Sequence, residues 1–232
     1  MSIAENIARI RENIAAAARE AGRDPGEILL VGASKMNGAA ACREAIAAGI
    51  DALGENRVQE MTAKLQENAY AGAPLHFIGH LQRNKVKQVV GKADLIQSVG
   101  SLELLDEIEK TAARLGMTQD VLLEVNIGQE TAKSGFFPAQ MLAGAEAALS
   151  REHIRVLGLM AIPPAEADRE TNLRYFDKIR AIFIDMDEKV FHNKLQYLSM
   201  GMSGDYADAI RAGATMVRIG TAVFGSRHYT EE

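Results

Sequence analysis

The sequence has little of what marks a secreted or membrane protein. Cys42 is the only cysteine, so no disulfide can form within the chain, and a reducing compartment is expected. No apolar run approaches the roughly 20 residues that a membrane helix needs. The first residues also lack the charged and apolar regions of a signal peptide. We therefore expect a cytoplasmic protein that has no membrane partner.

The chain also has no large excess of one charge, and it has no linker-like segments. The chain has 26 Lys and Arg against 31 Asp and Glu, a net charge of −5, with the two signs interspersed. This balance gives no reason to expect nucleic acid as a partner. No stretch rich in Pro, Gly or Ser divides the chain, and 47% of its residues are hydrophobic, enough for a sizeable core. Residues 1–232 are predicted to form a single domain.

The chain opens on a helix signal. Ser2 and Glu5 have the spacing of a capping box, and Ile7, Ile10 and Ile14 follow at helical spacing. Eight short apolar runs then alternate with helical patterns, at 28–34, 51–54, 75–79, 94–99, 120–127, 154–162, 195–200 and 214–219. The helical stretches are long enough for crossover connections, so neighbouring strands should be parallel.

Eight consecutive β/α units predict an α/β fold, a single (β/α)8 TIM-type barrel. An open doubly wound sheet is the alternative, but residues 32–38 do not match the G-x-G-x-x-G pattern expected after its first strand. Little chain remains after Gly225 for a full eighth outer helix. We expect the extra N-terminal helix to cover the face left open there.

Two glycine-punctuated stretches near the C-terminus predict a phosphate site. Residues 199–205 and 216–225 each place small residues and a hydroxyl where a strand turns into a helix. Such junctions present free N–H groups and the positive end of the helix dipole. In (β/α)8 barrels the loops after strands 7 and 8 often hold a phosphate, and Ser203, Gly204, Gly220 and Thr221 fall there. Taken alone, either loop is more simply explained as a turn with a helix cap. Two such loops after neighbouring strands favour a phosphate ligand.

A lysine and an arginine are expected beside these turns. Lys35 follows the first strand, which pairs with the eighth in a closed barrel. Strand alternation puts Val217 and Ile219 toward the helices and turns Arg218 inward. A guanidinium there needs an acceptor, which could be a structural carboxylate, a phosphate or the ring nitrogen of a pyridine cofactor. A lysine next to a phosphate site predicts an aldehyde cofactor.

Metal and nucleophile chemistry are not predicted. His76 and His80 are four residues apart, but the run between them reads as a strand, which would separate them by about 13 Å at ~3.3 Å per residue. They should therefore have structural or hydrogen-bonding roles and share no metal. Cys42 lies in a helical pattern with no nearby histidine in the sequence, so a buried structural role is expected.

From about residue 28 to 229 the sequence resembles the pyridoxal phosphate homeostasis proteins. The resemblance lies in residues 31–35, 54–60, 76–87, 133–136, 158–164, 198–205 and 217–225. It implies a barrel like the N-terminal domain of alanine racemase, with pyridoxal 5′-phosphate (PLP) held as a Schiff base on a lysine, and no well-established reaction. The residues that it implies are Lys35 for the Schiff base, Arg218 for the pyridine nitrogen, Ser203, Gly204, Gly220 and Thr221 for the phosphate, and Asn56 as a further cofactor neighbour.

The resemblance also implies a role in intracellular PLP homeostasis, with PLP-dependent apo-enzymes as partners; a monomer without catalytic residues is expected. After Lys35 the chain departs from the usual pattern, because Met36, Asn37 and Gly38 replace a small or polar residue followed by proline. This change predicts a looser loop at the entrance of the site.

Two other functions stay open on the sequence. An amino-acid racemase would use the same cofactor, but it needs a second acid/base on the opposite face of the substrate Cα. Alanine racemases supply a tyrosine from a C-terminal domain, which this chain, ending at Glu232, is expected to lack. A cationic Arg218 would also weaken the ring as an electron sink. The other function is that of an enzyme acting on a phosphorylated sugar, in which the Lys35 amine would form a Schiff base as in an aldolase.

Overall fold

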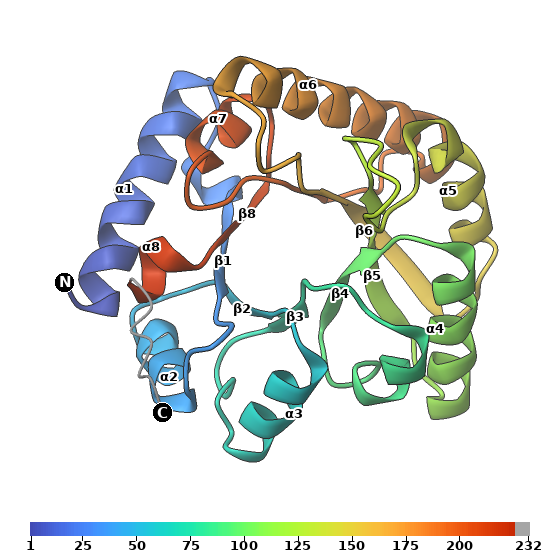
Figure 1. The fold of residues 1–232 in the computed structure, drawn as a ribbon, viewed down its shortest axis with the longest axis horizontal. Helices are drawn as coiled ribbons and strands as arrows, with labels where there is room; N and C mark the ends of the chain where they lie inside the picture. Colours follow the sequence, from blue (N-terminus) through green and yellow to red (C-terminus); the bar gives the residue numbers. More distant parts are fainter. Residues whose placement is uncertain (226–232) are drawn as a thin grey trace.

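All eight predicted strands form, and they close into a parallel barrel (Figure 1). The computed structural model describes residues 1–225, so the end of the resembling stretch, 226–229, lies outside the described residues. In chain order the strands are β1 (Leu29–Ala33), β2 (Ala52–Glu55), β3 (Leu75–Phe77), β4 (Leu95–Val99), β5 (Gln119–Val125), β6 (Ile154–Ala161), β7 (Tyr197–Ser199) and β8 (Met216–Ile219).

Closure of the sheet decides between the two predicted architectures. Each strand pairs in parallel with the next, and β8 pairs with β1 through Leu30 opposite Val217 and Gly32 opposite Ile219. An open doubly wound sheet would leave β1 and β8 unpaired with each other. The TIM-type barrel is therefore confirmed.

The helices form an outer ring around the strands (Figure 1). They are α1 (Ile3–Glu20), α2 (Ala39–Ala47), α3 (Val58–Gln66), α4 (Leu102–Leu115), α5 (Met141–Leu149), α6 (Arg169–Met186), α7 (Tyr206–Arg211) and α8 (Thr221–Phe224). A 3₁₀-helix, Arg83–Gln88, takes the place of an α-helix after β3, and α6 continues into a π-helical turn, Asp187–Phe191. No helix in the described part of the chain is long and apolar enough to cross a membrane.

The N-terminal helix covers the gap beside α8, as the sequence predicts. The capping box forms, because Ser2 Oγ accepts a bond from the Glu5 N–H and the Glu5 carboxylate accepts one from the Ser2 N–H. α8 has only four residues, and α1 packs against it and against α7 and α2. The buried Asn6 amide donates to the Val223 carbonyl at 3.0 Å. This bond ties α1 directly to the short helix.

Apolar side chains fill two layers, one between strands and helices and one inside the barrel. Strand alternation separates the layers: Leu30 joins the outer layer and Val31 the inner one. The inner layer contains Val31, Ala52, Leu95, Leu122, Met160 and Met216. Cys42 is fully buried in the outer layer, and burial raises the pKa of its thiol, which agrees with the structural role expected for it.

Candidate functional site

The ends of β7, β8 and β1 meet at one sector of the barrel mouth. The Met200 N–H donates to the Met216 carbonyl at 3.1 Å, and the Arg218 N–H donates to the Gly201 carbonyl at 3.0 Å, so the turn after β7 lies beside β8. Gly220 lies just as close to β1: a Cβ atom added to it would be 3.2 Å from the Ala33 carbonyl oxygen. The segments that carry the predicted phosphate and lysine residues are therefore neighbours.

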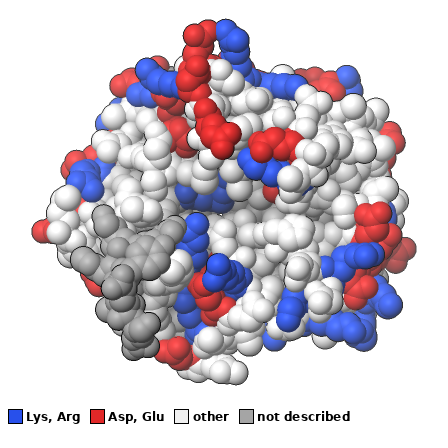
Figure 2. All heavy atoms as spheres, viewed as in Figure 1, with Lys and Arg blue, Asp and Glu red and all other residues white. Residues whose placement is uncertain are grey.

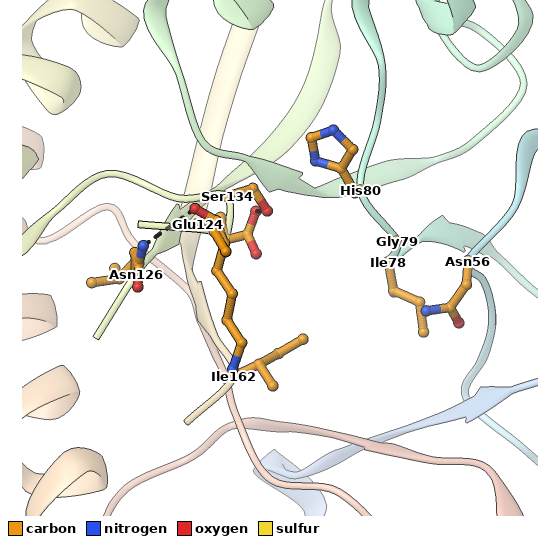
Figure 3. A pocket seen from close by; sticks show the side chains of 11 residues that line it. Asn56, Ile78, Gly79, His80, Glu124, Asn126, Ser134 and Ile162 are labelled. Atoms are coloured by element: carbon orange, nitrogen blue, oxygen red, sulfur yellow. Dashed lines mark hydrogen bonds between the residues drawn. The ribbon is translucent and has the colours of Figure 1, made fainter. Parts of the chain in front are cut away.

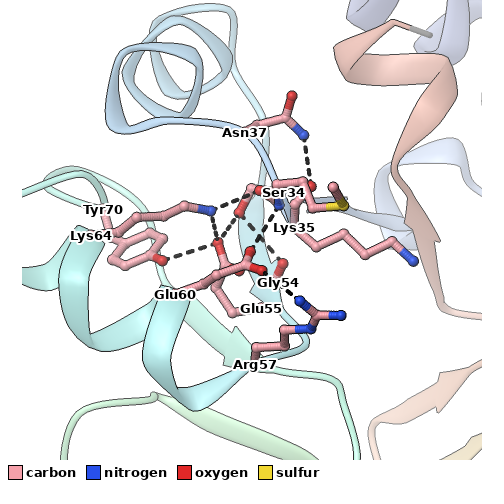
Figure 4. Close-up of polar contacts among 10 residues, drawn as sticks. Ser34, Lys35, Asn37, Gly54, Glu55, Arg57, Glu60, Lys64 and Tyr70 are labelled. Carbon is pink, nitrogen blue, oxygen red and sulfur yellow. Dashed lines mark hydrogen bonds and ion pairs between the residues drawn. The ribbon is translucent and has the colours of Figure 1, made fainter. Parts of the chain in front are cut away.

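Lys35 lies two residues beyond the end of β1, with an exposed side chain (Figure 4). Its ammonium makes no hydrogen bond or ion pair with any described residue, while its carbonyl accepts a bond from the Asn37 amide at 3.0 Å. The amine is thus accessible at the strand end where the sequence places it. The molecular surface, viewed along the same direction as the ribbon, shows Lys or Arg atoms bordering the central hollow (Figure 2).

Both predicted phosphate turns open short helices. Ser203 and Gly204 precede α7, and Gly220 precedes α8, whose first residue is Thr221. The residue before each helix, Asp205 or Gly220, makes no side-chain capping hydrogen bond within the described residues. Asp205 turns back to accept a bond from the Met202 N–H at 2.6 Å. A hydroxyl and a helix start therefore follow both β7 and β8, and the phosphate role of these four residues stays a prediction.

Arg218 lies inside the barrel, as alternation predicts, while Val217 and Ile219 pack in the outer layer. Its guanidinium donates to Ser199 Oγ at 2.5 Å and to the Ala161 carbonyl at 3.1 Å. Burial lowers the pKa of Arg218 to about 10, against the opposing effect of nearby carboxylates. No carboxylate in residues 1–225 forms an ion pair with Arg218, and Glu124 and Asp205 act on it only from a greater distance.

A chain of buried polar side chains holds the arginine from behind. Ser199 donates to Gln97 Oε1 at 2.7 Å, and Gln97 Nε2 lies 2.9 Å from His76 Nδ1. Burial lowers the pKa of His76 to about 4, so its imidazole is neutral near pH 7 and Nδ1 can accept the amide proton. All hydrogen bonds from Arg218 to His76 then have a defined direction. This confirms the hydrogen-bonding role expected for His76.

A cavity of about 410 Å³ opens at the mouth on the β2, β3, β5 and β6 side (Figure 3). Asn56 lines it, and its buried Oδ1 has no hydrogen-bond partner among the described residues. Across the cavity, Glu124 Oε2 accepts a bond from Ser134 at 2.9 Å, and burial raises the pKa of this carboxyl. Asn56 therefore borders open space at the mouth, as a ligand neighbour must.

The sequence reasoning missed the buried polar groups behind the site. Ser199 and Gln97 look like ordinary strand residues, and Glu55 and Lys64 look like surface charges, although all four are buried. Only Glu55 could have been linked to the site from the sequence, because it directly precedes Asn56 at a strand end. In residues 1–225 no group of three His, Cys, Asp or Glu side chains could hold a metal ion.

The strand-end lysine and the two small-residue turns lie at one sector of the mouth of a (β/α)8 barrel, and the arginine lies inside it. The family model for the N-terminal domain of alanine racemase matches residues 6–228. The pyridoxal phosphate homeostasis protein of Aquifex aeolicus is 42% identical over 229 residues, covering 99% of this chain and all of the relative. The chain therefore belongs to the family of pyridoxal phosphate homeostasis proteins.

Two solved structures place the fold in the same group. PipY of Synechococcus elongatus PCC7942, determined with PLP bound, has a TM-score of 0.84 and 32% identity, covering 97% of this chain and all of that one. An alanine racemase of Clostridium difficile 630 has a TM-score of 0.72 at 20% identity, covering 97% of this chain and 57% of that one. At that identity the racemase shares the barrel fold, which is all that the likeness shows.

Proposed function

We propose that this protein binds pyridoxal 5′-phosphate covalently through Lys35 and serves intracellular PLP homeostasis by holding the cofactor for delivery to apo-enzymes. The observation that carries the proposal is the meeting of Lys35 with the two small-residue turns at one sector of the mouth. A PLP-sized ligand needs an amine for its aldehyde and donors for its phosphate a short distance apart. The PLP bound to PipY, a structural neighbour along its whole length, supports PLP as the ligand.

The residues around the mouth fit the cofactor. PLP supplies an aldehyde that condenses with a primary amine, releasing water. Lys35 offers an accessible amine, while Ser203, Gly204, Gly220 and Thr221 offer hydroxyl and backbone donors to a phosphate. Arg218 keeps N–H groups without an acceptor among the described residues, which suits a ring nitrogen at the end of the site.

The chemistry of Arg218 favours a protein that binds PLP over one that uses it in strong catalysis. A guanidinium can only donate, so a ring nitrogen that faces Arg218 stays unprotonated, and the ring then withdraws electrons weakly. The names of the relatives support this interpretation, because they refer to homeostasis and not to a reaction. We further propose that residues 1–232 act as one cytoplasmic domain, a monomer, and that the racemase activity possible for this cofactor is negligible.

The test is to trap the adduct chemically. The loaded protein is reduced with borohydride and digested, and the modified lysine is located by mass spectrometry. We expect the label on Lys35, and we expect Lys35→Ala to lose the visible absorbance of the adduct while keeping the circular dichroism of the parent. Lys85→Ala, which removes a lysine of the 3₁₀-helix after β3, is the matched control and should keep both signals. A label on Lys85 or Lys133 would refute the assignment.

A further inference from the structure

The backbone on both sides of Lys35 is held by a single helix. Lys64 Nζ donates to the carbonyl oxygen of Ser34, the residue before Lys35, at 2.7 Å. Glu60 Oε2 accepts a bond from the N–H of Met36, the residue after Lys35, at 2.8 Å. Glu60 and Lys64 are four residues apart on α3, so they lie on one face of it, and each has the charge that its peptide partner requires (Figure 4).

A buried carboxylate fixes the position of Lys64. Glu55 is fully buried, and its Oε1 accepts bonds from Lys64 Nζ at 2.5 Å, from Ser34 Oγ at 2.5 Å and from the Tyr70 hydroxyl at 3.1 Å (Figure 4). Burial and Glu55 both raise the pKa of Tyr70, so this phenol stays a donor. A buried ion pair is often no more stabilising than apolar residues of the same volume, so its presence suggests a positional role.

The loop adopts a conformation that needs such support. Met36 has φ of 62°, in the left-handed region that is unfavourable for a residue with a side chain. Its side chain is 57% exposed, so packing does not hold the turn. The hydrogen bonds do: Asn37 N–H donates to the Ser34 carbonyl at 3.0 Å, in addition to the bond that Glu60 accepts. The loop is therefore fastened, in contrast to the looser loop expected from the missing proline.

We infer that Glu60 and Lys64 of α3 are positioning residues for Lys35: they fix the peptide groups that flank it and so aim its amine at the aldehyde of the ligand. The inference rests on the proposed PLP function. With its backbone fixed, the lysine searches only its own side-chain rotamers to reach the reactive geometry. Loss of either contact should weaken the covalent step and leave phosphate binding intact.

The experiment compares two ligands on two variants of Glu60, a half-buried residue. One ligand is PLP, and the other is 4′-deoxypyridoxine 5′-phosphate, in which a methyl group replaces the aldehyde. Glu60→Leu removes the acceptor for the Met36 N–H, and we expect about tenfold weaker binding of PLP, the lower end of the effect of losing a charge-assisted hydrogen bond. Binding of the deoxy analogue should change less than about twofold. Glu60→Gln keeps an acceptor oxygen and should restore most of the PLP affinity.

Lys64→Met provides the second arm, and Lys110→Met, at an exposed site on α4, is its matched control. Lys64→Met should show the same selective loss of PLP binding, and Lys110→Met should bind both ligands as the parent does. Equal weakening of the two ligands, or unchanged PLP binding by both Glu60→Leu and a folded Lys64→Met, would overturn the inference. Absence of any Lys35 adduct in the parent protein would instead refute the proposed function.

Discussion

Acidification should destabilise this protein through one buried histidine. His76 has a pKa of about 4 in the folded state against 6.5 for a free imidazole, because burial disfavours its charged form. As the pH falls below 6.5 the unfolded chain takes up this proton first, so His76 lowers the free energy of unfolding. The loss is complete only below pH 4, where both states are protonated. In this window, stability rises with pH.

The size of the effect follows from the two pKa values. A difference of 2.5 units, from 6.5 to about 4, corresponds to a ceiling of about 3.4 kcal/mol, of which about 2.4 kcal/mol is already lost between pH 7 and pH 4.5. Protonation would also remove the acceptor that His76 Nδ1 offers to Gln97. The chain of hydrogen bonds to Arg218 would then break at its far end.

Urea unfolding at pH 7 and pH 4.5 measures this contribution when the parent is compared with His76→Gln, which has no imidazole to protonate. Other carboxylates titrate in both proteins, so the difference between the two pH dependences isolates His76. We expect the parent to lose about 2.4 kcal/mol more than the variant over this range. Equal losses would show that His76 is not buried in its neutral form.

Three further predictions concern the site. Ser203→Ala and Thr221→Ala should each weaken PLP binding by about 10- to 150-fold, the effect of one hydrogen bond to a charged acceptor, while pyridoxal, which lacks the phosphate, should bind almost unchanged in equilibrium titrations. The loaded protein should form no D-alanine from L-alanine in deuterated water; D-alanine made at enzyme-like rates and lost in Lys35→Ala would favour the racemase. Glu55→Gln or Lys64→Met alone should lower the free energy of unfolding by about 3–5 kcal/mol, and the double variant by much less, as calorimetry would show.

The strands and their order could be predicted because apolar runs and crossover lengths leave few alternatives. The run at 154–162, for example, becomes β6 at Ile154–Ala161. The inward orientation of Arg218 followed from strand alternation alone, because both of its neighbours are apolar. The basic stretch after β3 forms a 3₁₀-helix, Arg83–Gln88, and its sequence does not distinguish this form from an α-helix.

The support behind the site could not be predicted in the same way. Lysine and glutamate on a helix or at a strand end are normally solvent-exposed, so nothing in the sequence marks Lys64 or Glu55 as buried. Their pairing depends on how α3 packs against the end of β2, where Glu55 lies nine residues from Lys64. The bond from Lys64 to the Ser34 carbonyl beyond β1 is a tertiary contact between residues 30 apart. The chain from Arg218 to His76 likewise crosses the barrel between strands distant in sequence.

If Lys35, Arg218 and Thr221 bind PLP as we propose, the closure of β8 onto β1 makes cofactor retention dependent on a completed chain. A growing polypeptide that stops before β8 already contains Lys35, but it lacks Arg218 and Thr221, and its β1 strand has an unpaired edge. Such an edge is prone to association with other chains. Synthesis of β8 and α8 supplies both the missing strand partner and the remaining residues that we propose to contact the ligand. Tight PLP binding would thus distinguish finished molecules from truncated ones at the ribosome.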